Sequence, residues 1–343
     1  MRVGMYYRNS DVRLEQLPVP EVDPGAILVK VMASGICGSD LLEWYRIKRA
    51  PLVLGHEVAG EVVEAGGEVR RFRQGDRVFA THHVPCGECH YCLNGHGTAC
   101  DTFQTTNNFS PGGFAEFVRV SGRSVHTGTL LLPDRLSCEE ASFIEPLGTA
   151  VRGLRTADLK PGDCLLVIGA GIAGLLMIKL AVALGAGRIV AVDVCEYRLR
   201  AALACGAEHV VPATEDVPGF VRQVNGGRLA DRVMLCAGAL PAAHQAVQSV
   251  DRGGMLVFFA VPRPGEEVSI DFNPFWRNDV SIRTCYGAAP LDNVQALELL
   301  RSGRITVSDL VTHRFGLSRI QEAFTVASRP ESCLKVIVEP QAA

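Results

Sequence analysis

The sequence predicts an α/β protein in which an irregular β domain is followed by a doubly wound parallel sheet. Two observations support this fold class. From Lys160 onward, strand-like and helix-like segments alternate, which is typical of right-handed βαβ units and a parallel sheet. Before that point, short β-type runs are separated by turns rich in glycine and proline. A chain of 343 residues also has room for two domains of roughly 150 residues each.

The β-type runs of the first part are short and irregularly spaced, which favours a barrel or a sandwich. They cover Ile27–Met32, Val58–Glu64, Arg77–Ala80 and Phe114–Val120. The second part contains six strand-like segments, the number expected in a doubly wound sheet. These segments are Cys164–Ile168, Arg188–Asp193, His209–Val211, Arg232–Cys236, Met255–Ala260 and Ser281–Tyr286. The helix patterns between and after them end near Leu184 and cover Arg198–Ala204, Pro241–Val250 and Leu291–Leu300, before a last β run at Leu334–Glu339.

Composition excludes several classes of protein. Hydrophobic residues make up 48% of the chain and charged residues 21%, which is too apolar for a disordered protein. The net charge is -3 without any lysine or arginine run, so we expect neither a nucleic-acid nor a membrane partner. The apolar stretch Cys164–Ile178 contains three glycines and ends at Lys179, which favours a strand and a helix over a membrane span. Residues 1–11 lack the apolar segment of a secretory signal, and we expect a soluble, cytoplasmic protein.

A glycine-rich turn lies at the start of the parallel-sheet region. Residues 169–174 read Gly-Ala-Gly-Ile-Ala-Gly, after a predicted buried strand and before a predicted helix. This context indicates dinucleotide binding, because the glycines allow a tight turn, close approach of the pyrophosphate and close helix–strand packing. A carboxylate at the end of the next strand binds the adenosine ribose and repels a 2′-phosphate, so Asp193 predicts NAD rather than NADP. Arg198 either lies beside the adenosine or is an ordinary surface arginine. The predicted cofactor residues are Gly169, Gly171, Ile172, Gly174, Asp193 and Arg198.

Four of the twelve cysteines are crowded into 15 residues. In a reducing compartment such a cluster indicates a metal site rather than disulfides. Cys86, Cys89, Cys92 and Cys100 have gaps of two, two and seven residues, and four thiolates form the closed tetrahedral site of a structural zinc. An iron–sulfur cluster is the competing interpretation, but the bacterial ferredoxin pattern has a three-residue last gap followed by proline. The loop also contains further possible ligands that are more simply ordinary loop residues: His83, His90 and His96.

A second set of metal-binding residue types is dispersed along the chain. Cys37, His56 and Glu57 lie in the β region, and Glu145 precedes the parallel sheet. Spacing alone does not show that they converge, and an ordinary buried histidine is the default interpretation of His56. An enzyme that moves hydride nevertheless gains from a Lewis acid that lowers the pKa of the substrate hydroxyl. Three protein ligands and one open position form such a catalytic zinc site.

Together these motifs resemble the zinc-dependent medium-chain dehydrogenases, the family of alcohol, sorbitol and threonine dehydrogenases. The segments that carry the resemblance occur in family order and span almost the whole chain: Gly35–Asp40, Gly55–Glu57, Cys86–Cys100, Ile144–Leu147, Gly169–Gly174 and Thr312–Phe315. The resemblance implies a GroES-like catalytic β domain of residues 1–147 and 287–343, with a Rossmann NAD-binding domain of residues 148–286 inserted into it. It also implies two Zn²⁺ per chain, one catalytic and one structural, and a homotetramer or homodimer.

The resemblance further implies roles for the dispersed residues. Cys37 and His56 would hold the catalytic zinc, with Glu57 able to exchange in and out of its ligand set. Glu145 stands where many alcohol dehydrogenases have a cysteine. A glutamate there is similar to the sorbitol and threonine branches, in which it binds zinc directly or through water. Ser39 would accept the proton of the substrate hydroxyl while hydride passes to the nicotinamide.

Two positions depart from the family pattern. Leu42 stands where a relay histidine is frequent, so the proton must leave through water, the nicotinamide ribose or Glu43. Gly287 lies near the position of an arginine that contacts polyols in sorbitol dehydrogenases, which weakens a polyol assignment. We still expect reversible oxidation of a secondary alcohol. The first substrate class is a polyol, sugar or cyclitol, followed by an amino alcohol such as threonine and then by a small alcohol.

Two interpretations without dehydrogenase activity fit less well. A structural or binding protein on a decayed dehydrogenase fold is disfavoured because the ligand set and the glycine turn are both intact. A zinc-ribbon nucleic-acid module would explain the cysteine cluster but not the net charge of -3. The sequence therefore predicts an oxidoreductase that acts on CH–OH groups.

Overall fold

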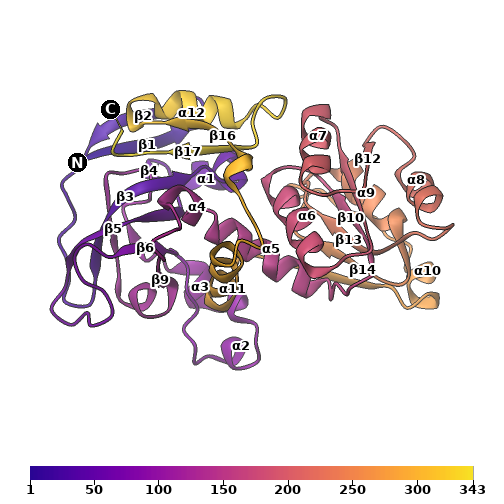
Figure 1. Cartoon of the computed structure of the whole chain (residues 1–343), viewed down its shortest axis with the longest axis horizontal. Helices are drawn as coiled ribbons and strands as arrows, with labels where there is room; N and C mark the ends of the chain where they lie inside the picture. Colours follow the sequence, from indigo (N-terminus) through magenta and orange to yellow (C-terminus); the bar gives the residue numbers. More distant parts are fainter. Residues whose placement is uncertain (343) are drawn as a thin grey trace. The chain divides into compact units, whose positions relative to one another are not determined.

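The computed structural model describes residues 1–342, which divide into two compact units. Unit 1 contains Met1–Gly148 and the segment that begins at Ala288, and unit 2 contains Thr149–Gly287. The colours of Figure 1 show this division, because indigo, purple and yellow segments share unit 1 while the intermediate colours form unit 2. Unit 2 is thus inserted into the sequence of unit 1.

Unit 1 is built on two sheets. A three-stranded sheet has the order β2-β1-β4, and an eight-stranded sheet has the order β16-β17-β3-β5-β6-β9, with β8 pairing β3 and β7. Strand β17 pairs antiparallel with β3, so early and late segments of the chain lie side by side (Figure 1). The strands are β1 (Arg2–Arg8), β2 (Asp11–Gln16), β3 (Ile27–Gly35), β4 (Leu52–Val53), β5 (Glu57–Ala65), β6 (Arg77–Ala80), β7 (Phe109–Ser110), β8 (Phe117–Val120), β9 (Thr129–Leu131), β16 (Val311–Phe315) and β17 (Lys335–Val338).

The helices of unit 1 are mostly short and lie in the connections between strands. They are α1 (Glu43–Arg46), α2 (His90–Leu93), α3 (Asp101–Thr105), α4 (Cys138–Ala141), α11 (Pro290–Arg301) and α12 (Ile320–Ala327), with a 3₁₀ turn η1 (Gly38–Leu41) after β3. Helix α5 (Ile144–Thr156) continues from unit 1 into unit 2. The predicted Glu145 segment is therefore the first turn of a helix.

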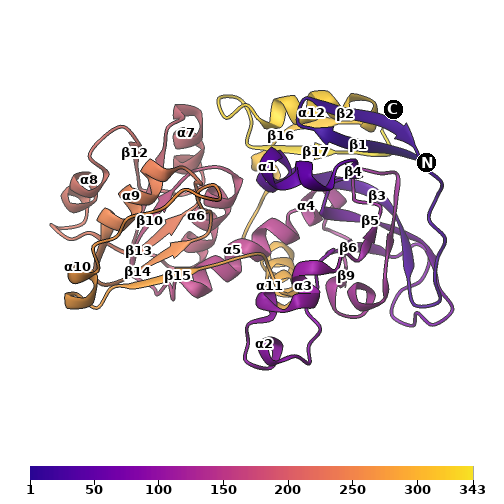
Figure 2. The same cartoon turned by 180° about the vertical axis from the view of Figure 1, so that it is seen from behind.

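Unit 2 contains the predicted doubly wound sheet. Its six strands are all parallel and have the order β12-β11-β10-β13-β14-β15, with β15 at one edge (Figure 2). The strands are β10 (Cys164–Ile168), β11 (Arg188–Asp193), β12 (His209–Pro212), β13 (Ala230–Leu235), β14 (Val250–Phe258) and β15 (Ser281–Thr284). The helices are α6 (Ile172–Leu184), α7 (Glu196–Ala204), α8 (Val217–Val224), α9 (Leu240–Ser249) and α10 (Phe272–Arg277). Strand β10 lies in the middle of this sheet, and the glycine-rich turn follows it directly in the sequence.

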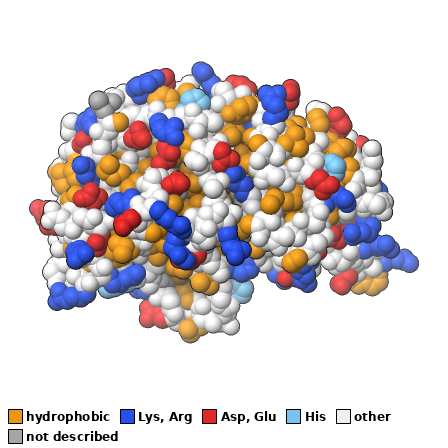
Figure 3. Space-filling model, in the orientation of Figure 1, with side chains coloured by type: hydrophobic (Ala, Val, Ile, Leu, Met, Phe, Trp, Pro, Cys, Tyr) orange, Lys and Arg blue, Asp and Glu red, His pale blue; other side chains and the backbone are white. Residues whose placement is uncertain are grey.

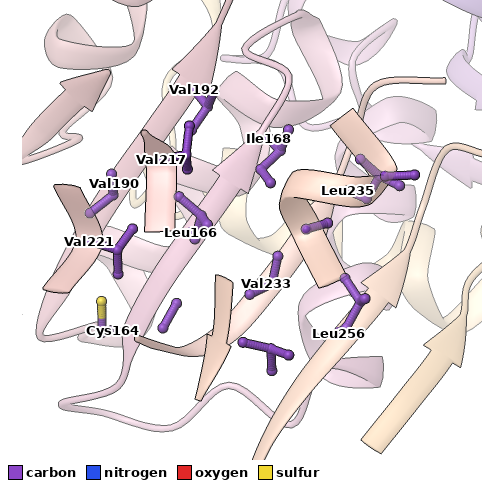
Figure 4. Close-up of a cluster of buried hydrophobic side chains, with 14 of the residues drawn as sticks. Cys164, Leu166, Ile168, Val190, Val192, Val217, Val221, Val233, Leu235 and Leu256 are labelled. Carbon is purple, nitrogen blue, oxygen red and sulfur yellow. The ribbon is translucent and has the colours of Figure 1, made fainter. Parts of the chain in front are cut away.

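The core of unit 2 shows why the β10 sequence lacks alternation. All five residues of β10 are buried, as expected for a strand of a parallel sheet that is covered on both faces. Cys164, Leu166 and Ile168 belong to one apolar cluster that also includes Val217 and Val221 of α8 (Figure 4). The Cys164 thiol thus acts as a small apolar side chain in this cluster.

Several elements differ from the prediction. Strand β8 starts at Phe117 rather than at Phe114, because Phe114 donates its N–H to Leu54 in a turn contact instead of joining the ladder. Helices α8 and α10 were not expected. For α8 the signal was present, since Asp216 caps the helix through the Gly219 N–H and Pro218 occupies its first turn. Strands β1 and β2 were also missed.

The surface carries acidic and basic side chains intermixed over the face seen in Figure 3. Within residues 1–342, no helix combines the length and apolar character needed to cross a bilayer.

Candidate active site and metal centres

Three of the dispersed residues converge at the end of strand β3 in unit 1. Cys37 caps the 3₁₀ turn η1 that follows β3, while His56 and Glu57 stand at the start of β5. Strands β3 and β5 are antiparallel and pair Gly35 with Glu57, which brings the two segments together. Ligand atoms of Cys37, His56 and Glu57 all lie within 4.8 Å of one another. A thiol, an imidazole and a carboxylate at this separation fit a single metal ion.

A buried carboxylate supports the histidine of this group. Asp40 is fully buried, and its Oδ1 lies 3.4 Å from Nδ1 of His56. Burial opposes the charged form of the imidazole, but Asp40 and Cys37 outweigh it and hold the pKa of His56 well above its usual value. Asp40 and Cys37 thus place negative charge beside His56, which favours the binding of a cation. A carboxylate on one ring nitrogen also leaves the other nitrogen free to bind a metal.

Glu145 borders the group without being part of it. It lies in the first turn of α5, and its carboxylate does not fall within the 4.8 Å set formed by the other three residues. Burial raises the pKa of Glu145 to about 7; His56 and Lys335 oppose this rise, and Glu57 adds to it. The structure thus places Glu145 beside the predicted ligands.

Ser39 lies in the turn between Cys37 and Asp40, and an arginine holds its hydroxyl. Nη2 of Arg46 donates to Ser39 Oγ at 2.9 Å, and Nε of Arg46 donates to the Ser39 carbonyl at 3.0 Å. The same guanidinium lies 3.4 Å from Oδ1 of Asp40. Arg46 was missed in the sequence because it lies on the following helix α1, seven residues from Ser39 and without a motif of its own.

Leu42 stands where a relay histidine is frequent in the family, and the residues around it make other contacts. Leu42 is 43% exposed and offers no polar group. The carboxylate of Glu43 accepts a hydrogen bond of 2.9 Å from the backbone N–H of Asn9. Arg46 is a donor only and cannot receive a proton. Of Leu42, Glu43 and Arg46, it is Arg46 that contacts Ser39. Arg46 therefore positions the Ser39 hydroxyl and does not relay its proton.

The four clustered cysteines also converge. Cys86 and Cys89 precede helix α2, Cys92 lies in it and Cys100 follows it, in a loop that projects from unit 1 (Figure 1). Their sulfurs all lie within 4.8 Å of one another. Sγ of Cys92 lies 3.8 Å from that of Cys86 and 3.5 Å from that of Cys89. Tetrahedral zinc with Zn–S distances of about 2.3 Å places sulfurs about 3.8 Å apart, so the spacing fits.

Backbone N–H groups point at these sulfurs, which favours their thiolate form. Cys86 donates its N–H to Sγ of Cys100 at 3.4 Å, Gly87 donates to Sγ of Cys92 at 3.3 Å, and Cys89 donates to Sγ of Cys86 at 3.3 Å. None of the three loop histidines joins this group within the described residues. His83, for example, contacts the Thr106 carbonyl instead.

In unit 2, the glycine turn has the geometry that its sequence predicts. Gly169 has φ +101°, a left-handed conformation that favours glycine. A Cβ on Gly174 would overlap the Gly169 carbonyl oxygen, so the third glycine is needed for close packing. Helix α6 starts at Ile172, and its cap residue Gly171 provides no side-chain hydrogen bond. The helix N-terminus is therefore available to an anionic group such as a pyrophosphate.

The carboxylate of Asp193 is attached to this turn. Its Oδ2 accepts the N–H of Ala170 at 2.8 Å, and its Oδ1 accepts the N–H of Cys195 at 2.9 Å. Arg198 lies against the turn as well, with Cζ 3.9 Å from the position of a Cβ on Gly171. Its Nε is buried and has no hydrogen-bond partner among residues 1–342. The structure thus brings together all the predicted cofactor residues. It also adds a role for Asp193 in holding the turn, which the sequence did not suggest.

Comparisons with known proteins agree with this arrangement. The alcohol dehydrogenase GroES-like domain model matches residues 23–134, and the zinc-binding dehydrogenase model matches residues 173–302. A sorbitol dehydrogenase of Bacillus subtilis (strain 168) is 32% identical over 99% of this chain and 97% of its own length. The chain belongs to the zinc-dependent medium-chain dehydrogenases.

Other relatives of this zinc-dependent dehydrogenase span different activities. An L-threonine 3-dehydrogenase of Mesorhizobium japonicum is 31% identical over 95% of this chain and 94% of its own length. The solved structure of an alcohol dehydrogenase from Thermus sp. ATN1 superposes with a TM-score of 0.89 at 30% identity, covering 99% of each chain. The family and the fold class predicted from the sequence are confirmed, and the chain is an oxidoreductase of this family.

A buried lysine is the second residue of the dehydrogenase site that sequence reasoning missed. Lys335 lies at the start of β17 and forms an ion pair with Glu57, with both side chains fully buried. Its ammonium also lies 5.7 Å from the centre of the Phe143 ring. The sequence offered one signal for it, since Lys335 is the only charged residue in the run Leu334–Val338.

Proposed function

We propose that this protein catalyses the zinc- and NAD-dependent oxidation of a secondary alcohol to a ketone, reversibly, on a polyol, sugar or cyclitol. The observation that carries the proposal is the convergence of Cys37, His56 and Glu57 in a chain that also has a complete glycine turn. A fold retained for binding alone would have no need to keep both. The similarity to a sorbitol dehydrogenase favours a polyhydroxylated substrate.

The residues present fit two zinc ions per chain. Cys37 and His56, with Glu145 beside them and Glu57 in reach, would hold the catalytic ion, and Cys86, Cys89, Cys92 and Cys100 the structural one. When bound, the catalytic zinc supplies a Lewis acid that lowers the pKa of the substrate hydroxyl. The four sulfurs leave no position for substrate, so the second ion stabilises its loop.

The chain's own residues manage the proton. Ser39 Oγ accepts the proton of the substrate hydroxyl and releases its own proton to water or to the nicotinamide ribose. Arg46 occupies one acceptor site of Ser39 Oγ, which fixes the hydroxyl and leaves its second acceptor site for the substrate. The positive charge of Arg46 beside this oxygen also favours release of the serine's own proton. NAD⁺ bound at the glycine turn would supply the hydride acceptor for the substrate carbon, so that alcohol and NAD⁺ would give ketone, NADH and H⁺.

NAD is the proposed cofactor, rather than NADP. Asp193 is 7% exposed and ends β11 next to the glycine turn, with each carboxylate oxygen already receiving one backbone N–H. Each oxygen keeps a further acceptor site for a ribose hydroxyl. A 2′-phosphate at the same place would be repelled by the negative charge. Arg198 would lie beside the adenosine half of the cofactor.

Two other substrate classes have support from relatives. The threonine dehydrogenase relatives favour an amino alcohol, and the Thermus structure favours a simple alcohol. A test would measure NAD reduction by the zinc-loaded enzyme with sorbitol, myo-inositol, glucose, L-threonine, 2,3-butanediol and 2-propanol. The proposal predicts the highest kcat/KM for one of the first three compounds. A higher value for L-threonine would replace the substrate class, and no turnover with any alcohol would contradict the function.

We also propose a cytoplasmic homodimer or homotetramer. None of the twelve cysteines, all of which lie in the described part of the chain, forms a disulfide, which fits a reducing compartment. The edge strand β15 is mostly exposed, and Trp276 on the neighbouring α10 is 84% exposed. An exposed edge with a large apolar side chain close to it in sequence favours self-association. Sedimentation of the purified protein would test this, and a monomer at micromolar concentration would contradict it.

A further inference from the structure

The segment that follows Ser39 ends in two basic side chains without a carboxylate partner. Helix α1 is followed directly by a 3₁₀ turn η2 (Ile47–Arg49), which carries Lys48 and Arg49 in exposed positions. Within residues 1–342, neither of these side chains forms an ion pair or a hydrogen bond. Many arginines of unit 1 do pair with a carboxylate: Arg2, Arg13, Arg73, Arg119, Arg314 and Arg319. The two adjacent cations of η2 are therefore available to an anion from outside the chain.

Arg46 fixes this segment to the candidate active site. Its guanidinium, at the end of α1, donates to both the hydroxyl and the carbonyl of Ser39. Glu43 is the only acidic residue of the segment 42–49, and its carboxylate accepts the backbone N–H of Asn9. The segment therefore lies beside the site, and its own carboxylate does not neutralise the two cations of η2.

Two histidine rings lie between the candidate metal site and Arg49. The ring centre of His82 lies 5.1 Å from that of His56, and the ring centre of His83 lies 3.7 Å from that of His82. Burial lowers the pKa of His83, and the positive charge of Arg49 contributes to this lowering. Arg49 therefore lies close to the second of the two rings, at some distance from the predicted metal ligand His56.

This arrangement favours a substrate that carries an anionic group several bonds away from its reacting hydroxyl. A phosphate monoester carries about −1.5 to −2 charges at pH 7 and three strong acceptor oxygens, so it suits two cations better than a carboxylate does. The planar guanidinium of Arg49 is able to bind two phosphate oxygens at once, and the ammonium of Lys48 adds a point charge. A phosphate at the end of a polyol or sugar chain has the required separation from an inner hydroxyl.

We propose that Lys48 and Arg49 form a subsite for the phosphate group of a phosphorylated polyol or sugar. The inference rests on the proposed function and deepens it, because it takes alcohol oxidation at Cys37 and His56 as given and names the substrate class. The reaction itself is the one proposed above: the alcohol carbon loses hydride to NAD⁺, its hydroxyl loses a proton, and the phosphate ester is unchanged. The subsite contributes binding and orientation only.

The test compares sorbitol 6-phosphate with sorbitol as substrates of the zinc-loaded full-length enzyme. We expect kcat/KM with NAD to be at least about tenfold higher for the phosphate ester, the scale expected for hydrogen bonds to a charged group. This ratio should fall at least about tenfold in Lys48→Gln/Arg49→Gln. Arg70→Gln is the matched control and should keep the ratio, because Arg70 is an exposed arginine that follows β5, a strand that begins with Glu57.

A binding measurement makes the test independent of turnover. In calorimetric titrations, the Kd of sorbitol 6-phosphate should rise at least about tenfold in Lys48→Gln/Arg49→Gln and stay at the wild-type value in Arg70→Gln. A Kd that the double variant leaves unchanged would overturn the inference, and so would equal kcat/KM values for the two substrates. Gluconate provides a carboxylate in place of the phosphate, and a higher kcat/KM for gluconate than for the ester would also overturn it. Binding of the ester that depends on Lys48 and Arg49, without oxidation of any alcohol, would contradict the proposed function alone.

Discussion

The two candidate metal sites of unit 1 both contain cysteine but lie in opposite surroundings. The four-cysteine centre lies in a projecting loop, its ligands come from 15 consecutive residues, and backbone N–H groups support its sulfurs. The centre at Cys37 and His56 draws its groups from β3, β5, α5 and β17, and buried charges surround it.

This difference separates a structural site from a chemical one. Four equivalent thiolates would satisfy a zinc ion completely, so such an ion would stabilise the cysteine loop and leave no position for substrate. The other centre has a mixed ligand set in which the Glu57 carboxylate is already shared with Lys335, and Ser39 is held by Arg46 close to it. Removing a ligand should therefore affect stability in one centre and turnover in the other.

The largest expected effect is that of Cys37→Ala. Loss of this ligand should remove about one zinc per chain and lower kcat/KM at least about a thousandfold, because metal charge stabilisation contributes several kcal/mol and each 1.4 kcal/mol is about tenfold. Zinc analysis and NAD reduction would measure both effects. If turnover stayed within tenfold of wild type, the assignment of the catalytic site would be wrong.

Arg46→Met tests whether the charges around the site at Cys37 and His56 matter for turnover, in addition to the metal ligands themselves. The hydrogen bond from a guanidinium to Ser39 is worth about 1.5–3 kcal/mol, so kcat should fall about tenfold to a hundredfold while zinc content stays at two per chain. Arg70→Met is the matched control, because Arg70 is an exposed arginine of the same unit. Equal effects of the two variants on kcat would remove the special role of Arg46.

Asp193→Ala extends the comparison to the predicted cofactor site at the glycine turn, which would bind its ligand without a metal ion. The variant loses the repulsive carboxylate, and the ratio of kcat/KM for NAD to that for NADP should fall at least about tenfold, which corresponds to about 1.4 kcal/mol. Because Asp193 also receives the N–H groups of Ala170 and Cys195, the melting temperature should fall too. Glu196→Gln, an exposed neighbour, is expected to change neither quantity. An unchanged cofactor ratio in Asp193→Ala would contradict its proposed role.

The smallest effect on catalysis is expected for Cys92→Ser. This change should release the other zinc and lower the melting temperature by about 4–8 °C, as expected for a loss of about 2 kcal/mol in a domain of this size. The kcat/KM of the folded enzyme should stay within about twofold of wild type. Calorimetry and zinc analysis would show this, whereas a loss of turnover comparable to that of Cys37→Ala would end the distinction between the two centres.

The features that could be predicted from the sequence are those that depend on residue spacing within a short stretch of chain. The glycine turn, the cysteine cluster and the six strands of unit 2 are all patterns within short windows, and each appears in the structure where it was expected. Lys335 and Arg46 were missed because their contacts depend on strand pairing and on a short helix. No spacing rule connects Lys335 with Glu57, and only the adjacency of β17, β3 and β5 brings them together.

The same adjacency affects the order in which the protein matures. Glu57 and Lys335 are 278 residues apart in sequence, whereas the cysteine cluster closes within 15. Contacts between distant segments form late in folding, and domains begin to fold while the chain is still being synthesised. The cysteine loop is therefore able to take up metal early, whereas the site at Cys37 acquires its final charge arrangement only after β17 has paired with β3. A nascent chain without β17 should accordingly lack the ammonium that pairs with Glu57 in the folded protein.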